Sequence, residues 1–254
     1  MNQPKTIDLN CDMGESFGQW RMGKDEEIMQ FVSSANIACG FHAGDPDTIA
    51  KTIRFAKAAG VAVGAHPSFP DLEGFGRRKM TIPPETVKNI VAYQISAVAG
   101  MCRAQGIELR HVKPHGALYN MAAKDTELAA AIASAVKSVD SNLILYGLSG
   151  SALIDEAKSV GLRAINEVFA DRGYDAEGHL VPRGTEGSMI RNPEAALQQV
   201  LELVGQGAVT AVSGESVNVE AETICIHGDA DTALEFASTI HSGLLSAGYV
   251  IESP

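Results

Sequence analysis

The sequence has few cysteines and no closely spaced pair of them. Its 254 residues include Cys11, Cys39, Cys102 and Cys225, and no two of these form a CxxC motif. Zinc knuckles and disulfide frameworks depend on close, regular spacing. We therefore expect neither, and we interpret most of the cysteines as reduced, buried, small apolar residues.

Long apolar runs are also missing. No stretch approaches the roughly 20 apolar residues that a helix needs to span a bilayer. The first ten residues, MNQPKTIDLN, lack the apolar run of a signal peptide. The sequence therefore predicts a cytoplasmic protein that has no membrane partner.

Positive charge is scarce. The chain has 20 Lys and Arg against 31 Asp and Glu, which gives a net charge of −11 at pH 7. This balance argues against a broad surface for nucleic acid or an anionic membrane. A pocket can still be locally basic and take an anionic small molecule. The candidates for that role are Lys113, His115, Arg77, Arg78 and Arg172.

Three common catalytic signatures do not occur. The sequence has no GxxxxGK[ST] phosphate loop, no HExxH zinc motif and no GxSxG nucleophile elbow. Asp12, His42, His66 and His115 could converge on a metal ion, but no ligand pair has a diagnostic spacing. The identity of any bound metal is therefore left open.

Short β-like runs alternate with longer amphipathic ones along the whole chain. The predicted strands are residues 6–12, 35–40, 61–67, 108–114, 142–147, 162–169 and 223–228. The predicted helices are residues 24–32, 46–60, 83–106, 125–139, 151–161, 192–205 and 231–248. Such alternation indicates a parallel sheet with helical crossovers.

Seven such units in about 250 residues favour a TIM-like (β/α)7 barrel, with a doubly wound open sheet as the alternative. Residues 207–222 break the rhythm, since their alternating pattern around SGES is typical of a small β-hairpin inserted before the last strand. With no linker and no internal repeat, residues 1–254 are expected to form a single domain.

Polar residues recur at every second position of the predicted strands. In LRHVKPH, for example, His111, Lys113 and His115 share one face of an extended segment. The interior of a packed barrel is rich in Val, Ile and Leu, so buried polar groups there cost desolvation free energy unless they belong to a polar site. The pattern predicts a pocket at the carboxyl ends of the strands. The residues that share this parity include Asp8, Asn10, Asp12, Asn36, His66, Glu167, Cys225 and His227.

Three of the predicted strand-to-helix loops begin with groups that can do chemistry. Asp12 and Glu15 lie in CDMGESFG, where they could act as a base or bind a cation, although Glu15 could also cap a turn. His42 is a candidate acid, base or ligand, whereas Asp45 has the position of a helix N-cap. His66 precedes a long loop that contains Arg77 and Arg78.

Another long loop follows the sixth predicted strand. Residues 167–184 read EVFADRGYDAEGHLVPRG and contain Asp171, Arg172 and Arg183. Loops of this length commonly form lids or binding sites. We expect Asp171 and Arg172 to contact substrate, and the alternative is a solvated flap.

Six motifs in one order resemble the LamB/YcsF family. They are DLNCDMGESFG, SANIACGFHAGDP, GAHPSFPD with GFGRR, HVKPHGALYN, EVFADRGY with LVPRG, and CIHGD. The resemblance covers residues 6–229, and these motifs show no departure from the family pattern.

The resemblance implies a seven-stranded TIM-like barrel of the glycoside hydrolase/deacetylase group. It also implies ATP-dependent opening of 5-oxoproline to L-glutamate, with ADP and phosphate formed. Mg²⁺ is then expected to accompany ATP, and two partner subunits, B and C, are expected to work with this chain.

On this basis we assign residue roles as hypotheses. Asp12, His66, Lys113 and His115 are predicted to be catalytic: Asp12 or His66 would handle the proton of the attacking water, and Lys113 and His115 would hold phosphate or the substrate carboxylate. The predicted substrate-binding residues are Asn10, Glu15, His42, Asp171 and Arg172.

Two alternatives to this function remain open. One is a metal-dependent amide or deacetylase-type hydrolase that needs no ATP. The other is a non-catalytic subunit that binds a lactam or a carbohydrate, in which case substitution of Lys113 or Asp12 would weaken binding without changing a chemical step.

Overall fold

The strands of this computed structural model, which describes residues 5–227 and 232–254, form a closed parallel barrel. Within the described residues the barrel has seven strands in the order β1-β2-β3-β4-β5-β6-β9, and β9 closes the ring by pairing with β1. These strands are Lys5–Met13, Ser34–Ala38, Ala62–His66, Leu109–Val112, Ile144–Leu148, Ala164–Phe169 and Thr223–Ile226. The predicted TIM-like fold is therefore confirmed.

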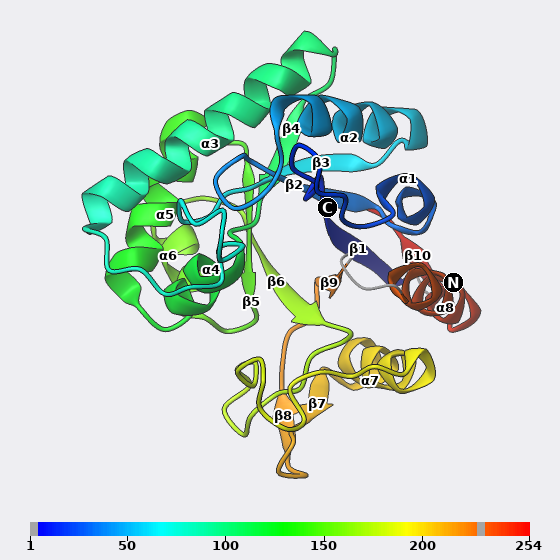
Figure 1. Cartoon of the computed structure of the whole chain (residues 1–254). Coiled ribbons are helices and arrows are strands. Elements are labelled where there is room, and N and C mark those ends of the chain that lie inside the picture. Colours follow the sequence, from blue (N-terminus) through cyan, green and yellow to red (C-terminus); the bar gives the residue numbers. More distant parts are fainter. Residues whose placement is uncertain (1–4, 228–231) are drawn as a thin grey trace.

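Helices surround the barrel (Figure 1). They are α1 (Asp25–Ile28), α2 (Pro46–Ala59), α3 (Pro84–Ala104), α4 (Gly116–Ala122), α5 (Thr126–Val139), α6 (Ala152–Ser159), α7 (Pro193–Gln206) and α8 (Ala233–Ser246). The predicted helix at 24–32 is divided, because α1 ends at Ile28 and a 3-10 turn follows at Met29–Phe31.

The hairpin insertion is also confirmed. β7 (Ala208–Thr210) and β8 (Ser216–Asn218) pair antiparallel and form a small sheet beside α7, at the lower edge of Figure 1. Two short elements were not predicted from the sequence. One is α4, and the other is β10 (Tyr249–Ile251), which pairs with the first residues of β1.

The apolar core lies between the barrel and its helices. On β1, Ile7, Leu9 and Cys11 are buried in this core, and the residues between them point into the barrel. All four cysteines are buried and free, as predicted. Among the described residues, no helix is both long enough and apolar enough to cross a bilayer.

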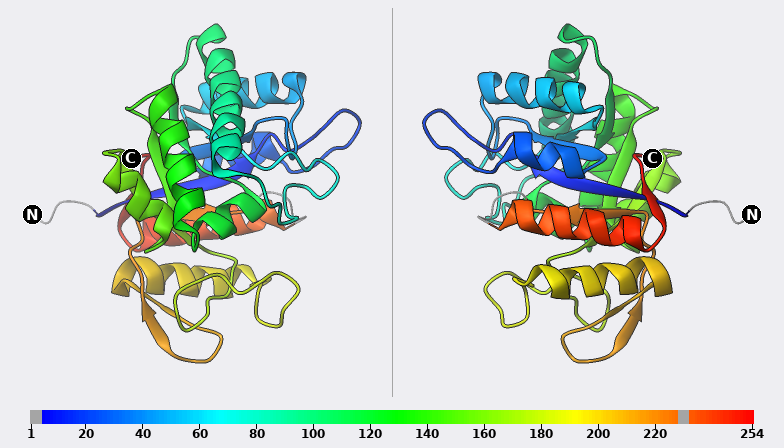
Figure 2. Two further views of the ribbon diagram at one scale, coloured as in Figure 1. Left: turned by 90° about the vertical axis from the view of Figure 1, so that its left-hand side faces the viewer. Right: turned by 90° about the vertical axis from the view of Figure 1, so that its right-hand side faces the viewer.

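Three long loops leave the barrel at the same end. They follow β1, β3 and β6 and comprise residues 14–24, 67–83 and 170–192. Figure 2 shows them projecting from the end opposite to β10. Because all the barrel strands are parallel, their carboxyl ends meet there, and the site is expected at this end.

Candidate active site

The barrel interior is polar along its length, beginning near the amino ends of the strands. There, Asp8 Oδ1 accepts hydrogen bonds from Ser33 and Ser34, and Oδ2 accepts from Tyr146 and Thr223. Burial raises the pKa of the Asp8 carboxyl above its ordinary value, and the four hydroxyl donors oppose this rise.

The next layer is a network of amides. Asn36 Nδ2 donates to Asn10 Oδ1 at 2.7 Å and to Asp12 Oδ1 at 2.9 Å, and Asn10 Nδ2 donates to Glu167 Oε1 at 3.0 Å. His111 Nε2 lies 2.7 Å from Asn36 Oδ1, to which it can only donate. Burial, and then the charge of Lys113, lowers the pKa of His111 to about 3, so the ring is neutral at pH 7.

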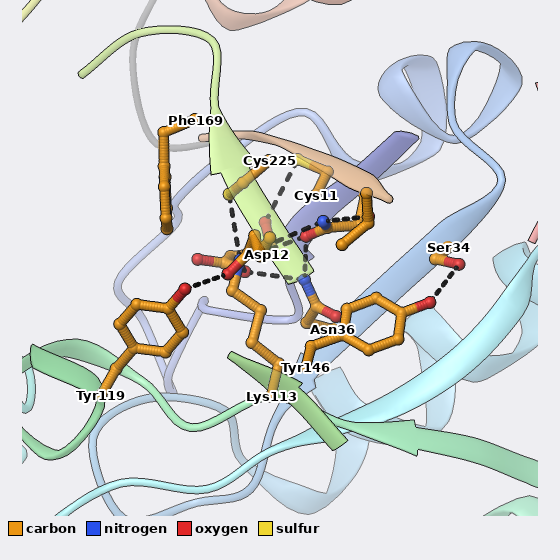
Figure 3. A network of polar contacts seen from close by, with 12 residues as sticks. Cys11, Asp12, Ser34, Asn36, Lys113, Tyr119, Tyr146, Phe169 and Cys225 are labelled. Carbon is orange, nitrogen blue, oxygen red and sulfur yellow. Dashed lines mark hydrogen bonds and ion pairs between the residues drawn. The ribbon is translucent and has the colours of Figure 1, made fainter. Parts of the chain in front are cut away.

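Lys113 contacts these amides, and Figure 3 shows its side chain reaching toward Asp12 and Cys225. Its Nζ is 3.0 Å from Asp12 Oδ1, 2.7 Å from Glu167 Oε1 and 3.1 Å from Asn10 Oδ1. It also lies 3.0 Å from Cys225 Sγ, so Cys225 is in contact with a charged group. The Lys113 side chain is buried, as are both carboxylates.

The charges in this cluster stabilise one another. Burial alone would lower the pKa of Lys113, but Asp12, Cys225 and Glu167 hold it well above its ordinary value. Burial would likewise raise the pKa of Asp12, but His66 and Lys113 hold it well below its ordinary value. At neutral pH the site therefore contains an ammonium group beside an ionised carboxylate.

Two histidines extend the cluster toward the loops. His66 Nε2 lies 3.2 Å from Asp12 Oδ2 and 2.9 Å from His115 Nδ1. The other ring nitrogens contact backbone carbonyls: His66 Nδ1 lies 2.6 Å from the oxygen of Lys113, and His115 Nε2 lies 2.9 Å from that of Phe75. Both rings are thereby fixed in orientation.

Four side chains at this end of the barrel could hold a metal ion. The ligand atoms of Glu15, His42, His66 and His115 lie within 4.8 Å of one another. Two further groups also have metal-ligand side chains close together. They are Asp12 with Cys225 and His227, and Asp175 with Glu177 and His179.

A cavity of about 690 Å³ opens above this cluster. Asp12, Glu15, His66, Lys113 and His115 all contribute to its lining. Its wall also carries cationic side chains that could contact phosphate or carboxylate oxygens, namely Arg77, Lys79, Lys124, Arg172 and Arg183. The locally basic pocket predicted for this acidic protein is therefore present.

The loop after β6 contributes to one wall of the cavity. Asp171 Oδ2 lies 2.8 Å from Nδ1 of His227. The guanidinium of Arg172 donates to the carbonyl oxygens of Ser188 and Val181, at 3.0 and 2.6 Å, and so ties its own loop together. Burial lowers the pKa of Arg172 to about 10.

Other predicted site residues lie outside the cavity lining. Asn10, His42 and Asp171 are all buried, and none of them contributes to the lining. Arg78 forms an ion pair with Asp71 and lies 3.6 Å from Glu73, so the prediction that it contributes to the basic pocket is wrong. The roles assigned to the other residues stay predictions.

Several residues that contact the cluster were not among the predicted catalytic or substrate-binding residues, and Glu167, Tyr119 and Phe169 are three of them. Glu167 contacts Lys113, and Tyr119 donates to Glu167 Oε2 at 2.7 Å. Lys113 Nζ lies over the ring of Phe169, 5.4 Å from the ring centre. Glu167 has the inward parity that the strand pattern predicted, whereas Tyr119 lies in α4, a helix that the sequence did not reveal.

These features together define a class of protein. A closed parallel barrel with charged groups at the carboxyl ends of its strands, below a cavity of this size, is a TIM-like barrel with an enzyme-type site. The family model described as "LamB/YcsF family" matches residues 7–254, and the chain belongs to this family.

Known proteins resemble this chain over almost its whole length. The A subunit of 5-oxoprolinase from Bordetella pertussis is 57% identical over 247 residues, which cover 97% of this chain and 98% of that protein. The protein of the same name from Bacillus subtilis is 52% identical, covering 95% and 94%. The crystal structure of the lactam utilization protein from Thermus thermophilus superposes with a TM-score of 0.93 at 48% identity, covering 98% of this chain and 100% of that one.

Proposed function

We propose that this chain is a component of an ATP-dependent 5-oxoprolinase, which hydrolyses 5-oxo-L-proline to L-glutamate while ATP is converted to ADP and phosphate. The names of its relatives support the reaction. The structural observation that carries the proposal is the buried Asp12–Lys113 ion pair at the floor of a cavity with cationic side chains in its wall.

This chemistry needs both an activated carbonyl and controlled proton transfer. The lactam is a stable amide, and transfer of the ATP γ-phosphoryl group to its carbonyl oxygen makes the ring carbon electrophilic. Water then attacks that carbon, and cleavage of the C–N bond leaves a free amine and an acyl phosphate. A second water releases phosphate and leaves the carboxylate of glutamate.

Asp12 is suited to remove the proton from the attacking water. Its carboxylate is ionised, lines the cavity, and is held in place by Asn36 and Lys113. His66, 3.2 Å from Asp12, can take part in the same proton transfer. A base that is fixed from several sides loses little entropy when water is positioned against it.

Lys113 is suited to bind an anionic group of the substrate, whereas the ring of His115, whose pKa burial lowers well below its ordinary value, adds no positive charge. Lys113 Nζ retains its positive charge beside two carboxylates, so it can stabilise negative charge that develops on the reacting oxygen. Arg77 and Lys79 line the same cavity closer to solvent and can contact phosphate oxygens. Asp171 and Arg172 would order the loop that closes one wall.

We further propose that the chain works with two partner subunits, B and C, since its relatives are named as the A subunit of a 5-oxoprolinase. ATP would enter the reaction with a divalent cation such as Mg²⁺. The partners would supply the parts of the reaction that this barrel does not carry.

A second candidate function is a metal-dependent amide or deacetylase-type hydrolase that uses no ATP. The observation that favours it is the convergence of Glu15 with three histidines beside the cavity. In this case a carbonyl would be polarised without phosphoryl transfer.

One assay separates the two candidates. Glutamate and ADP are measured for the chain alone, and then with purified subunits B and C, each with and without ATP. We expect equal amounts of glutamate and ADP in the complete mixture only. If no glutamate forms in that mixture, the 5-oxoprolinase proposal is wrong, and if glutamate forms equally well without ATP, the second candidate replaces it.

A further inference from the structure

We propose that Glu15, His42, His66 and His115 form a binding site for one divalent transition-metal ion of the zinc type. The four residues come from the carboxyl ends of four consecutive strands, β1 to β4, or from the loops directly after them. The inference concerns metal binding and holds whichever reaction the barrel catalyses.

The first observation is the spacing of the ligand atoms. Glu15 Oε1 lies 3.7 Å from His42 Nε2 and 3.8 Å from His115 Nδ1, and His115 Nδ1 lies 2.9 Å from His66 Nε2. With metal–nitrogen bonds of about 2.1 Å, neighbouring ligands on one ion lie about 3.0 to 3.5 Å apart. Small movements of these side chains therefore suffice to bring them onto a common ion.

The second observation is the orientation of the His66 and His115 rings. His66 Nδ1 and His115 Nε2 each contact a carbonyl oxygen, so both must carry a hydrogen. The other two nitrogens, His66 Nε2 and His115 Nδ1, lie 2.9 Å apart. They are the ring atoms of these two histidines that come within ligand distance of Glu15 and His42.

The third observation is His42. Its side chain is buried, and neither of its ring nitrogens has a hydrogen-bond partner. It stacks on His115 with ring centres 3.9 Å apart, and one nitrogen of each ring, His42 Nε2 and His115 Nδ1, lies near Glu15 Oε1. A buried polar group without a partner is destabilising, and coordination of a metal ion would give His42 a partner.

The loop after β3 fixes the positions of these rings. Gly76 has φ +65°, and a Cβ atom there would lie 2.8 Å from His115 Cδ2 and 2.9 Å from His42 Cβ. The ring of Phe75 packs edge-on against both histidines, at 5.6 and 5.2 Å. Backbone carbonyls and apolar cover of this kind orient imidazole ligands in metal sites.

The donor set indicates the class of metal. Three neutral imidazoles and one carboxylate suit Zn²⁺, Fe²⁺, Co²⁺ or Ni²⁺ better than Ca²⁺ or Mg²⁺, which prefer oxygen ligands. Co²⁺ is therefore a suitable spectroscopic probe, and Zn²⁺ a suitable competitor.

The test is a titration of the metal-stripped protein with Co²⁺, followed by visible absorption, and a calorimetric titration with Zn²⁺. We expect one saturable equivalent of Co²⁺ that Zn²⁺ displaces. His42→Gln and Glu15→Gln should each weaken binding by about 100-fold or more, since loss of even an outer-shell partner costs 10- to 100-fold.

His179→Ala is the matched control, because His179 belongs to a separate, more exposed group with Asp175 and Glu177. The affinity of the His179→Ala variant for Co²⁺ should equal that of the unchanged chain. The proposal is overturned if the unchanged chain binds no Co²⁺ saturably, a result that does not depend on whether any variant folds. It is also overturned if folded His42→Gln binds normally, or if His179→Ala removes the binding.

Discussion

At the residue scale, Lys113 holds together charges that would otherwise repel one another inside the barrel. Its ammonium group contacts Asp12 and Glu167, which are both buried carboxylates. Breaking a buried ion pair by removing one partner is strongly destabilising, because the remaining charge stays out of water without compensation.

Lys113→Met is therefore expected to lower the free energy of unfolding by about 3–5 kcal/mol. Urea denaturation at pH 7 measures the change. Lys79→Met, at an exposed lysine on the cavity wall, is the control and should change it by no more than about 0.5 kcal/mol. Equal stability of the two variants would show that Lys113 does not neutralise these carboxylates.

Gly64 illustrates how closely the interior side chains pack. A Cβ atom at this position of β3 would lie 2.1 Å from His111 Nε2, the atom that donates to Asn36. The position needs glycine for space, since its φ is not positive.

Gly64→Ala is expected to destabilise the protein by about 1–3 kcal/mol, because the His111 ring must move in a full interior. Gly205→Ala in α7, where a Cβ atom meets nothing within 4 Å, should instead stabilise it by about 0.5–1 kcal/mol. Thermal unfolding of both variants checks the pair. If Gly64→Ala were as stable as the unchanged chain, the packing around His111 described above would be wrong.

Much of the interior could be predicted residue by residue from strand parity. The pattern of period 2 brings Asn10, Asp12 and Lys113 to one side, and the structure brings them into contact. The same rule could not identify Tyr119, because its approach to Glu167 depends on a helix of seven residues. Nor could it show that Cys225 contacts an ammonium group, because a buried cysteine in a strand resembles any small apolar residue.

At the scale of the element, α2 shows how one side chain positions a loop of the site. Asp45 is the N-cap that the sequence predicted, and its Oδ1 accepts from the N–H groups of Asp47 and Thr48. Its Oδ2 accepts from Gly18 in the loop after β1, which also contains Glu15. The cap therefore links α2 to that loop.

Asp45→Ala is expected to cost about 1 kcal/mol of stability at pH 7, because the first turn of α2 loses its acceptor. The bonds from Thr48 and Gly18 lower the pKa of Asp45, so its contribution is complete above the unfolded value of about 3.9 and is lost as the pH falls through the folded value. Urea denaturation at pH 7 and at lower pH should show the difference between variant and unchanged chain shrinking with acid. A difference that stays constant or grows would contradict the assignment.

The longer elements were predictable because each has a strong period and clear ends. Helix α2 begins at Pro46 and ends before Gly60, which has φ 71°, as its sequence indicates. β10 has only three residues and is held by pairing with β1, a contact between opposite ends of the chain. Nothing local in its sequence specifies that pairing.

At the scale of the whole molecule, closure of the barrel creates the site. β9 pairs with both β6 and β1, so Thr223 and Asp8 form a hydrogen bond although 215 positions separate them. The alternation of strands and helices predicted this barrel, but it left an open doubly wound sheet as an alternative. In an open sheet Lys113 would not lie between residues of the first and sixth strands.

The cavity is likewise a property of the whole molecule. Its wall combines the loops after β1, β3 and β6, which Figure 2 shows at one end of the barrel. The sequence identified these loops by their length and charge, but which arginines face the cavity depends on local pairing. Arg77 lines it, whereas its neighbour Arg78 is paired with Asp71.

The proposed opening of the lactam depends most directly on the Asp12 carboxylate at the barrel floor. Its test is the rate of glutamate formation from 5-oxoproline and ATP by the chain together with subunits B and C, for Asp12→Asn and for Asp140→Asn. Asp140 is an exposed residue at the end of α5, away from this cavity. We predict that Asp12→Asn lowers the rate by about 10²–10⁴-fold while the protein stays folded, and that Asp140→Asn leaves it unchanged. A folded Asp12→Asn variant that forms glutamate at the normal rate would contradict the proposed role of this carboxylate.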